Sequence, residues 1–137
     1  MIIDGKDSPL GRVATVAAKS ATRGEQVIIT NAESIVIIGN KKSILEKYLQ
    51  RREVGTTSKG PFFPRTVTGI VKRAVRGMVK RQVPKGREAF RRVMVFEGVP
   101  EEYSGKEAVS VGKYRMDIPL HKVKIGELSQ ILKYRQS

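Results

Sequence analysis

A chain of 137 residues, 39% hydrophobic and 29% charged, is long enough for one folded domain with its own core. The absence of cysteine excludes a disulfide framework, a thiolate metal site and a cysteine nucleophile, and no apolar run approaches the roughly 18 residues of a membrane span. The net charge of +14 directs attention to anionic partners. The N-terminal segment lacks the charged and apolar regions of a secretory signal, so we expect none.

The first thirty residues predict a strand, a helix and a second strand. Residues 1–4 are apolar enough for a short strand. Ser8 is placed to cap the helix, and Pro9 suits its first position. Small apolar residues then recur at helical spacing up to Ala21, and the β-branched run 26–30 predicts a buried strand. This order is a βαβ unit, which implies two parallel strands joined by a right-handed crossover.

The next segment predicts a strand, a helix and a long loop. Residues 34–38 read as a turn followed by a strand, and Asn40 is placed to cap a helix over 41–52. The loop over 53–66 holds two Pro, two Gly and two Phe and is too long for a simple connector. Its two aromatic residues, Phe62 and Phe63, fit two roles equally well: stacking on nucleic-acid bases or plugging an apolar surface.

Residues 67–81 predict a strongly amphipathic helix. One face is apolar at helical spacing and is formed by Val67, Ile70, Val71, Ala74, Val75, Met78 and Val79. The opposite face is cationic and is formed by Lys72, Arg73, Arg76 and Lys80. We expect Pro84 and Gly86 to interrupt the pattern before a short helix over 87–92 that Phe90 anchors, followed by a strand over 93–96.

The remainder of the chain, 101–137, is rich in turn residues and reads as a C-terminal extension packed on the core or on neighbouring molecules. A short terminal helix over 126–134 is expected within it. Residues 1–100 then form an α/β core domain that carries the basic helices.

The positive charge is concentrated in one block. Residues 1–40 are neutral overall, and residues 93–137 carry a net +1. Residues 41–92 carry sixteen Lys or Arg and three acidic residues, a net +13. A solvated helix face normally alternates charge signs, whereas Lys72, Arg76 and Lys80 are like-charged neighbours four residues apart. A membrane patch would place Trp, Phe or Leu beside the cations, but here the apolar face is needed for a core. Nucleic acid is the partner that this pattern favours.

Catalytic and metal-binding patterns are missing from the sequence. His121 is the only histidine and reads as a surface residue, and Asp4 and Asp7 read as acids that favour a helix N-terminus. No His, Asp or Glu cluster has metal-ligand spacing, and no glycine-rich phosphate loop follows a strand. We therefore expect no catalytic residue, no metal and no cofactor.

Several stretches together resemble a known family. They are SPLGRVATVAAK (8–19), VIITNAESIVIIGNKK (27–42), KGPFFPR (59–65), VRGMVKRQVPKGREAFRRVMVFEGVPEEY (75–103) and VKIGELSQILKY (123–134). In this order they are similar to the universal large-subunit ribosomal protein L-thirteen family in its archaeal form. The resemblance implies a three-layer α/β/α fold around a mostly parallel four-stranded sheet. It also implies a cytoplasmic location in the large ribosomal subunit, with ribosomal RNA and neighbouring ribosomal proteins as partners.

The resemblance and the charge pattern together define the expected RNA-binding residues. They are Arg12, Lys41, Lys42, Lys47, Arg51, Arg52, Lys59, Arg65, Lys72, Arg73, Arg76, Lys80, Arg81, Lys85, Arg87, Arg91 and Arg92. The resulting hypothesis is a non-enzymatic protein that binds and stabilises large-subunit rRNA through a basic helical face. A free RNA-binding translational regulator would use the same cations, and an enzyme on an α/β sheet would require a titratable cluster that the sequence does not offer.

Overall fold

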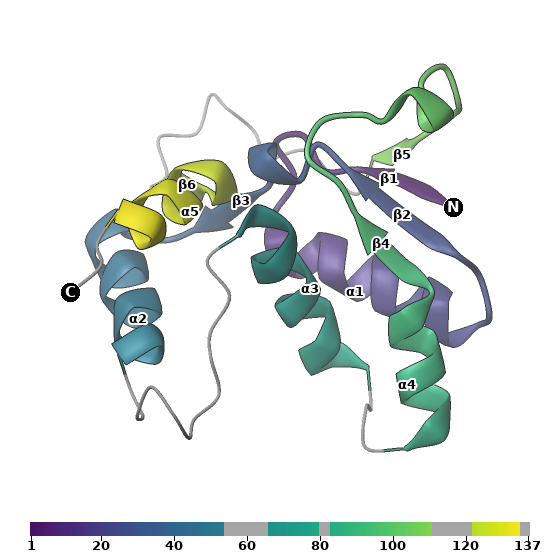
Figure 1. Cartoon of the computed structure of the whole chain (residues 1–137), viewed down its shortest axis with the longest axis horizontal. Helices are drawn as coiled ribbons and strands as arrows, with labels where there is room; N and C mark the ends of the chain where they lie inside the picture. Colours follow the sequence, from purple (N-terminus) through teal and green to yellow (C-terminus); the bar gives the residue numbers. More distant parts are fainter. Residues whose placement is uncertain (54–65, 80–82, 111–121, 135–137) are drawn as a thin grey trace.

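The computed structural model describes residues 1–53, 66–79, 83–110 and 122–134 (Figure 1). The elements, in chain order, are β1 (Ile2–Asp4), α1 (Leu10–Thr22), β2 (Val27–Thr30), the 3₁₀ turn η1 (Ala32–Ser34), β3 (Val36–Ile38), α2 (Lys41–Glu53), α3 (Val67–Met78), α4 (Pro84–Arg91), β4 (Val93–Val95), the 3₁₀ turn η2 (Glu101–Tyr103), β5 (Val109–Ser110), β6 (Lys122–Lys124) and α5 (Ile125–Tyr134).

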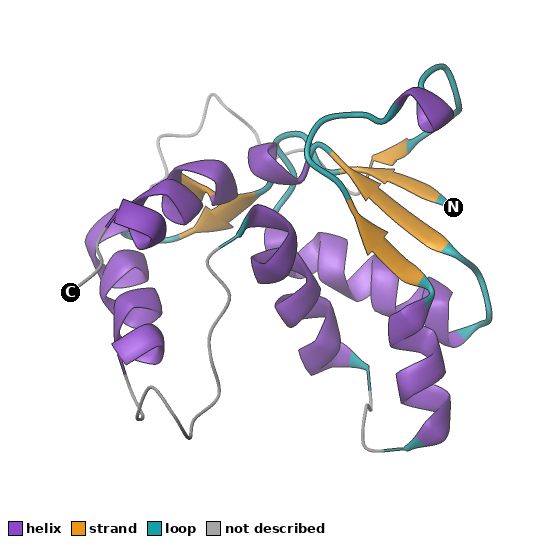
Figure 2. Cartoon of the chain, in the orientation of Figure 1, coloured by secondary structure: helices purple, strands orange, loops and turns teal. Residues whose placement is uncertain are grey.

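The main sheet has four strands in the order β4-β2-β1-β5, and every neighbouring pair is parallel. Ile3 lies opposite Ile29, which lies opposite Val95, and the first two side chains are fully buried. The predicted α/β class and the parallel βαβ opening are confirmed, and the arrangement is consistent with three layers. Figure 2 shows the sheet with the helices gathered beside it.

The strand predicted over 34–38 exists, but it belongs to a second sheet. Asn31 has a left-handed φ of 53° and opens η1, which turns the chain out of the main sheet. β3 then pairs antiparallel with β6, and the main sheet takes β5 as its fourth strand. The expected C-terminal extension therefore contributes two strands that its turn-rich sequence did not indicate. An apolar run predicts burial, but the pairing partner is set by the turn before it.

The helical layer is built on α1. Its buried residues are Val13, Ala14, Ala17, Ala18, Ser20 and Ala21. α3 packs along this small-residue face, and α4 packs beside it (Figure 1). α3 buries Val67, Ile70, Val71 and Val75 against the same core, as its predicted apolar face required.

Three details at the helix ends differ from the predictions. Ser8 does not cap α1: it is fully buried, and its hydroxyl is turned back toward the carbonyl oxygens of Asp4 and Lys6. α3 ends at Met78, and this side chain is 47% exposed, whereas Val79 just beyond the helix is buried. Pro84 and Gly86, which were expected to lie between two helices, both lie within α4.

The second basic helix starts three residues earlier than predicted. Pro84 takes the first position of α4, where its missing N–H costs no hydrogen bond. The buried contacts of α4 are made by Gly86 and Ala89, while Phe90, the expected anchor, is half-buried. The small residues bring α4 close to its neighbours.

The connection from β4 to β5 joins the two edges of the main sheet. Because these strands lie at opposite edges, residues 96–108 must cross the sheet. η2 lies on this path, and its Tyr103 ring lies 5.9 Å from the ring of Phe96.

The C-terminal helix α5 buries Ile125, Leu128 and Leu132 completely in the same core as α3. The division of the chain at residue 100 stays a prediction. Within the described ranges, no helix has the length and apolar character of a membrane span.

Gly5 is tightly packed beneath the core. A Cβ at this position would lie 2.6 Å from Cγ1 of Ile35 and 2.9 Å from the carbonyl oxygen of Thr30. We predict that Gly5→Ala lowers the free energy of unfolding by about 1–3 kcal/mol, because neither the core nor the backbone can move away cheaply. Urea unfolding followed by circular dichroism measures this change.

Gly11→Ala is the matched control. Gly11 lies in the first turn of α1 with nothing within 4 Å of an added Cβ. Alanine there should leave stability unchanged or raise it by up to about 1 kcal/mol. Equal urea midpoints for the two variants would show that Gly5 is not sterically required.

Candidate nucleic-acid interface

The carboxyl edge of the main sheet, where α/β proteins usually bind ligands, is filled by structural hydrogen bonds. The side-chain amide of Asn31 donates to Asp4 Oδ1 at 3.0 Å, and the backbone N–H of Asn31 donates to the carbonyl of Gly98 at 2.9 Å. The N–H of Gly98 in turn donates to Glu33 Oε2 at 2.9 Å. Asp4 thus closes the sheet edge instead of serving the N-terminus of α1, whose first turn holds no acid.

The part of the chain that the structure describes also contains no group of three His, Cys, Asp or Glu side chains that could hold a metal ion. His121 lies outside it. The chemistry that remains is that of the cations, so their positions decide what the surface can bind.

The cations of α3 are only partly available to solvent. Lys72, Arg73 and Arg76 are all half-buried, whereas the helical pattern predicted a cationic face pointing away from the core. The Lys72 ammonium lies 5.9 Å from the centre of the Phe90 ring of α4. This cation–π contact joins the two basic helices and holds a charge without neutralising it.

α4 carries three cations that are accessible to solvent. Lys85, Arg87 and Arg91 are exposed, and no ion pair involves them among the described residues. Arg92 behaves differently. Its guanidinium donates to the carbonyl oxygen of Ala21 at 2.9 Å, in the last turn of α1, and lies 3.9 Å from the Glu88 carboxylate. Arg92 therefore ties α4 to the C-terminal end of α1, where a cation favours the helix dipole.

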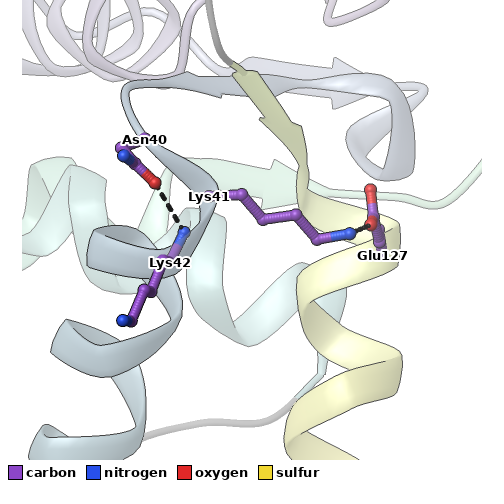
Figure 3. Close-up of polar contacts among 4 residues, drawn as sticks. All are labelled: Asn40, Lys41, Lys42 and Glu127. Carbon is purple, nitrogen blue, oxygen red and sulfur yellow. Dashed lines mark hydrogen bonds and ion pairs between the residues drawn. The ribbon is translucent and has the colours of Figure 1, made fainter.

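The two lysines at the start of α2 have different surroundings (Figure 3). The Asn40 side chain accepts a hydrogen bond from the Lys42 N–H at 2.9 Å, which confirms the predicted cap. Lys41 forms an ion pair with Glu127 of α5. The Lys42 ammonium points away from that pair and is exposed, as is Lys47 one turn further on. Both members of the Lys41 pair are about half exposed, so the pair contributes at most about 1 kcal/mol.

The structure brings together only some of the expected RNA-binding residues. α1, α3 and α4 form one group, which gathers Arg12, Lys72, Arg73, Arg76, Lys85, Arg87, Arg91 and Arg92 on neighbouring helices. α2, with Lys41, Lys42 and Lys47, lies at the other end of the molecule beside α5 (Figure 1). Lys59, Arg65, Lys80 and Arg81, with the side chains of Arg51 and Arg52, lie outside the described residues, as do Phe62 and Phe63.

Two further cations belong to the same helical group but are not among the expected RNA-binding residues. Lys19 and Arg23 are exposed at the C-terminal end of α1, beside the end of α4 that Arg92 fixes. The charge count along the chain did not reveal them, because residues 1–40 are neutral overall. Their spacing of four residues on one helix face is the signal that would have identified them.

Comparison with known proteins gives one consistent result. The family model described as ribosomal protein L13 matches residues 1–102. The large ribosomal subunit protein uL13 of Archaeoglobus fulgidus is 43% identical over 77% of this chain and 68% of its own length. Its counterpart from Methanopyrus kandleri is 38% identical over 98% of this chain and 87% of its own, and that from Methanocaldococcus jannaschii is 42% identical over 80% and 82%.

Adjacent arginines test the distinction between a structural cation and an accessible one. We predict that Arg92→Ala lowers the free energy of unfolding by about 1–2 kcal/mol, because the Ala21 carbonyl loses a charge-assisted hydrogen bond. Arg91→Ala removes an exposed side chain and should change stability by less than about 0.5 kcal/mol. Urea unfolding compares them, and equal losses would show that Arg92 does not fix α4 on α1.

Proposed function

Because the chain belongs to the ribosomal protein L13 family, we propose that it is a structural constituent of the large ribosomal subunit and binds large-subunit rRNA through its basic helical group. The relatives it matches are named as large-subunit proteins. In this proposal the chain acts without a cofactor, and its work is to hold folded RNA segments together.

The observation that carries this proposal is the set of accessible cations on α4. Lys85, Arg87 and Arg91 are exposed, and the one acid of that helix, Glu88, lies nearest to Arg92. Arg87 and Arg91 are four residues apart, where like charges on a helix repel each other. A polyanion converts this repulsion into attraction, since each phosphate that pairs with a cation also releases a condensed counterion.

The mode of recognition follows from the kind of side chain. Arginine forks pair with two phosphate oxygens at once, and lysine ammonium groups act as point charges. Such contacts read the path of the RNA backbone and carry little base information directly. The rigid packing of α3 and α4 on α1 sets the spacing of the cations, so the protein should select an RNA shape more than a sequence.

Salt dependence of rRNA binding tests the phosphate contacts. If six to eight cations contact phosphates, log Kobs should fall against log salt concentration with a slope of roughly −4 to −7. We predict that the triple variant Lys85→Ala, Arg87→Ala, Arg91→Ala flattens this slope by about 2–3, because three contacts are lost. Filter binding to deproteinised archaeal large-subunit rRNA over a salt series measures it.

A charge-matched control separates local contacts from net charge. Lys6, Lys106 and Lys124 are exposed cations on other parts of the surface. Replacing all three by Ala removes the same charge and should leave the slope nearly unchanged. If both triple variants flatten the slope equally, the α4 cations form no defined interface.

Sedimentation tests the place of the chain in the cell. On a sucrose gradient of cell lysate, we expect the chain to travel with the large subunit and to remain there after a high-salt wash, since buried phosphate contacts are weakly screened. A free translational regulator would stay near the top of the gradient or leave the subunit in high salt. That distribution would refute the structural role while leaving RNA binding intact.

A further inference from the structure

An open groove runs along the C-terminal half of α1, beside the end of α3. Its volume is about 570 Å³, and it is lined by Thr15, Ala18, Lys19, Thr22, Arg23 and Met78. This volume lies within the roughly 300–1,000 Å³ typical of small-ligand sites. We propose that the groove holds one unpaired nucleotide of the bound rRNA. The base lies against Met78 and against the α1 residues that form the floor of the groove. The flanking phosphates contact Lys19 and Arg23. This inference rests on the proposed function.

The floor of the groove is more apolar than its residue types suggest. The hydroxyl of Thr15 donates to the carbonyl of Gly11, and that of Thr22 donates to the carbonyl of Ala18, both at 2.7 Å. Each hydroxyl hydrogen is therefore used within α1. The flat face of a nucleobase can lie on such a surface without stripping water from an unsatisfied donor.

Met78 forms the apolar wall. It is 47% exposed, although its place in the helical pattern predicted a core residue. Its sulfur lies 3.4 Å from the hydroxyl oxygen of Thr15, which holds the end of α3 against the middle of α1. A thioether is polarizable and makes favourable contacts with aromatic rings. The exposed part of this side chain is available to an aromatic ligand in the groove.

Lys19 and Arg23 form the charged rim. They are exposed and four residues apart, so they repel each other, and no ion pair involves either within the ranges the structure describes. Proximity to the C-terminal end of α1 offsets part of this cost through the helix dipole. An anion that bridges the two cations offsets the rest.

The combination of wall, floor and rim identifies the occupant. An acidic peptide would satisfy the rim but would have little use for the apolar floor, and an apolar peptide would leave both cations unpaired. A nucleotide presents a flat aromatic base and a phosphate on each side. The groove also lies in the helical group of the proposed interface, because α1 packs directly against α3 and α4. RNA that follows the cations of α4 can therefore place a nucleotide here.

The test measures binding of a short single-stranded uridine RNA, a duplex of the same length and deproteinised archaeal large-subunit rRNA. Met78→Gln keeps the charge and removes the thioether, and it should weaken single-strand binding about two- to tenfold with little effect on the duplex. Lys19→Ala with Arg23→Ala should reduce the single-strand salt slope by about 1.4. Lys6→Ala with Lys124→Ala is the control of equal charge. Ultraviolet crosslinking of the uridine RNA should map to the segment of α1 that holds Lys19 and Arg23.

The outcomes separate this inference from the proposed function. If the groove variants bind every RNA like the control, while the unmodified chain still binds rRNA, the groove does not hold a nucleotide and the proposed function stands. A loss of incorporation into large subunits without loss of RNA affinity would reassign the groove to a protein neighbour and overturn the inference. If the unmodified chain binds none of the RNAs, both proposals fail.

Discussion

The arrangement of the basic surface depends on one packing contact, the close approach of α3 and α4 to α1. The buried face of α1 includes Ala14, Ala17 and Ala21, which are fully buried and add nothing beyond a methyl group to the helix surface. Neighbouring helices can therefore come near its backbone, and the distance between helices is set by the side chains at the contact. α4 also buries small residues, Gly86 and Ala89. Because these contacts consume the apolar faces, the cations of α3 and α4 are left at the surface of the helical layer.

The fold fixes two of these cations through uncharged groups. Lys72 lies over the ring of Phe90. Arg92 donates to the carbonyl of Ala21 and also lies 3.9 Å from the Glu88 carboxylate. A ring quadrupole and a carbonyl dipole fix the position of a cation, but neither subtracts a unit of charge as a carboxylate would. The basic helices are therefore ordered before they meet an anion. A partner with a matching arrangement of phosphates binds a preformed surface and loses less conformational entropy in doing so.

Sequence patterns predicted the elements better than their partners. The amphipathic period of α3, the small face of α1 and the cap at Asn40 are local properties, and each was confirmed. The separate pairing of β3 with β6 was missed because it depends on the turn at Asn31, more than eighty residues before its partner strand. Met78 was predicted in the core because it continues the apolar period of the helix, but its side chain is 47% exposed. The half-burial of Lys72 was missed because it requires α4 as a neighbour.

The same distinction applies to the surface. Charge counting along the chain located the basic block, but it grouped α2 with α3 and α4. In the structure α2 lies beside α5, at the other end of the molecule from α3 and α4. Charge counting also passed over Lys19 and Arg23, because acids elsewhere in residues 1–40 cancel them in a sum although they do not pair with them in space. A segment's net charge is a property of the chain, whereas a binding surface is a property of the packed helices.

An α/β sheet normally offers its carboxyl edge for binding, and here that edge is closed. The hydrogen bonds from Asn31 to Asp4 and Gly98, and from Gly98 to Glu33, use the polar groups that a ligand would need. Closing the edge makes the sheet a rigid support, since strands β1, β2 and β4 are joined at their ends as well as along their ladders. In the proposed function, binding takes place on the helices that the sheet supports and not at the strand ends. A large polyanion suits that location, because it can follow an extended surface with fixed charges.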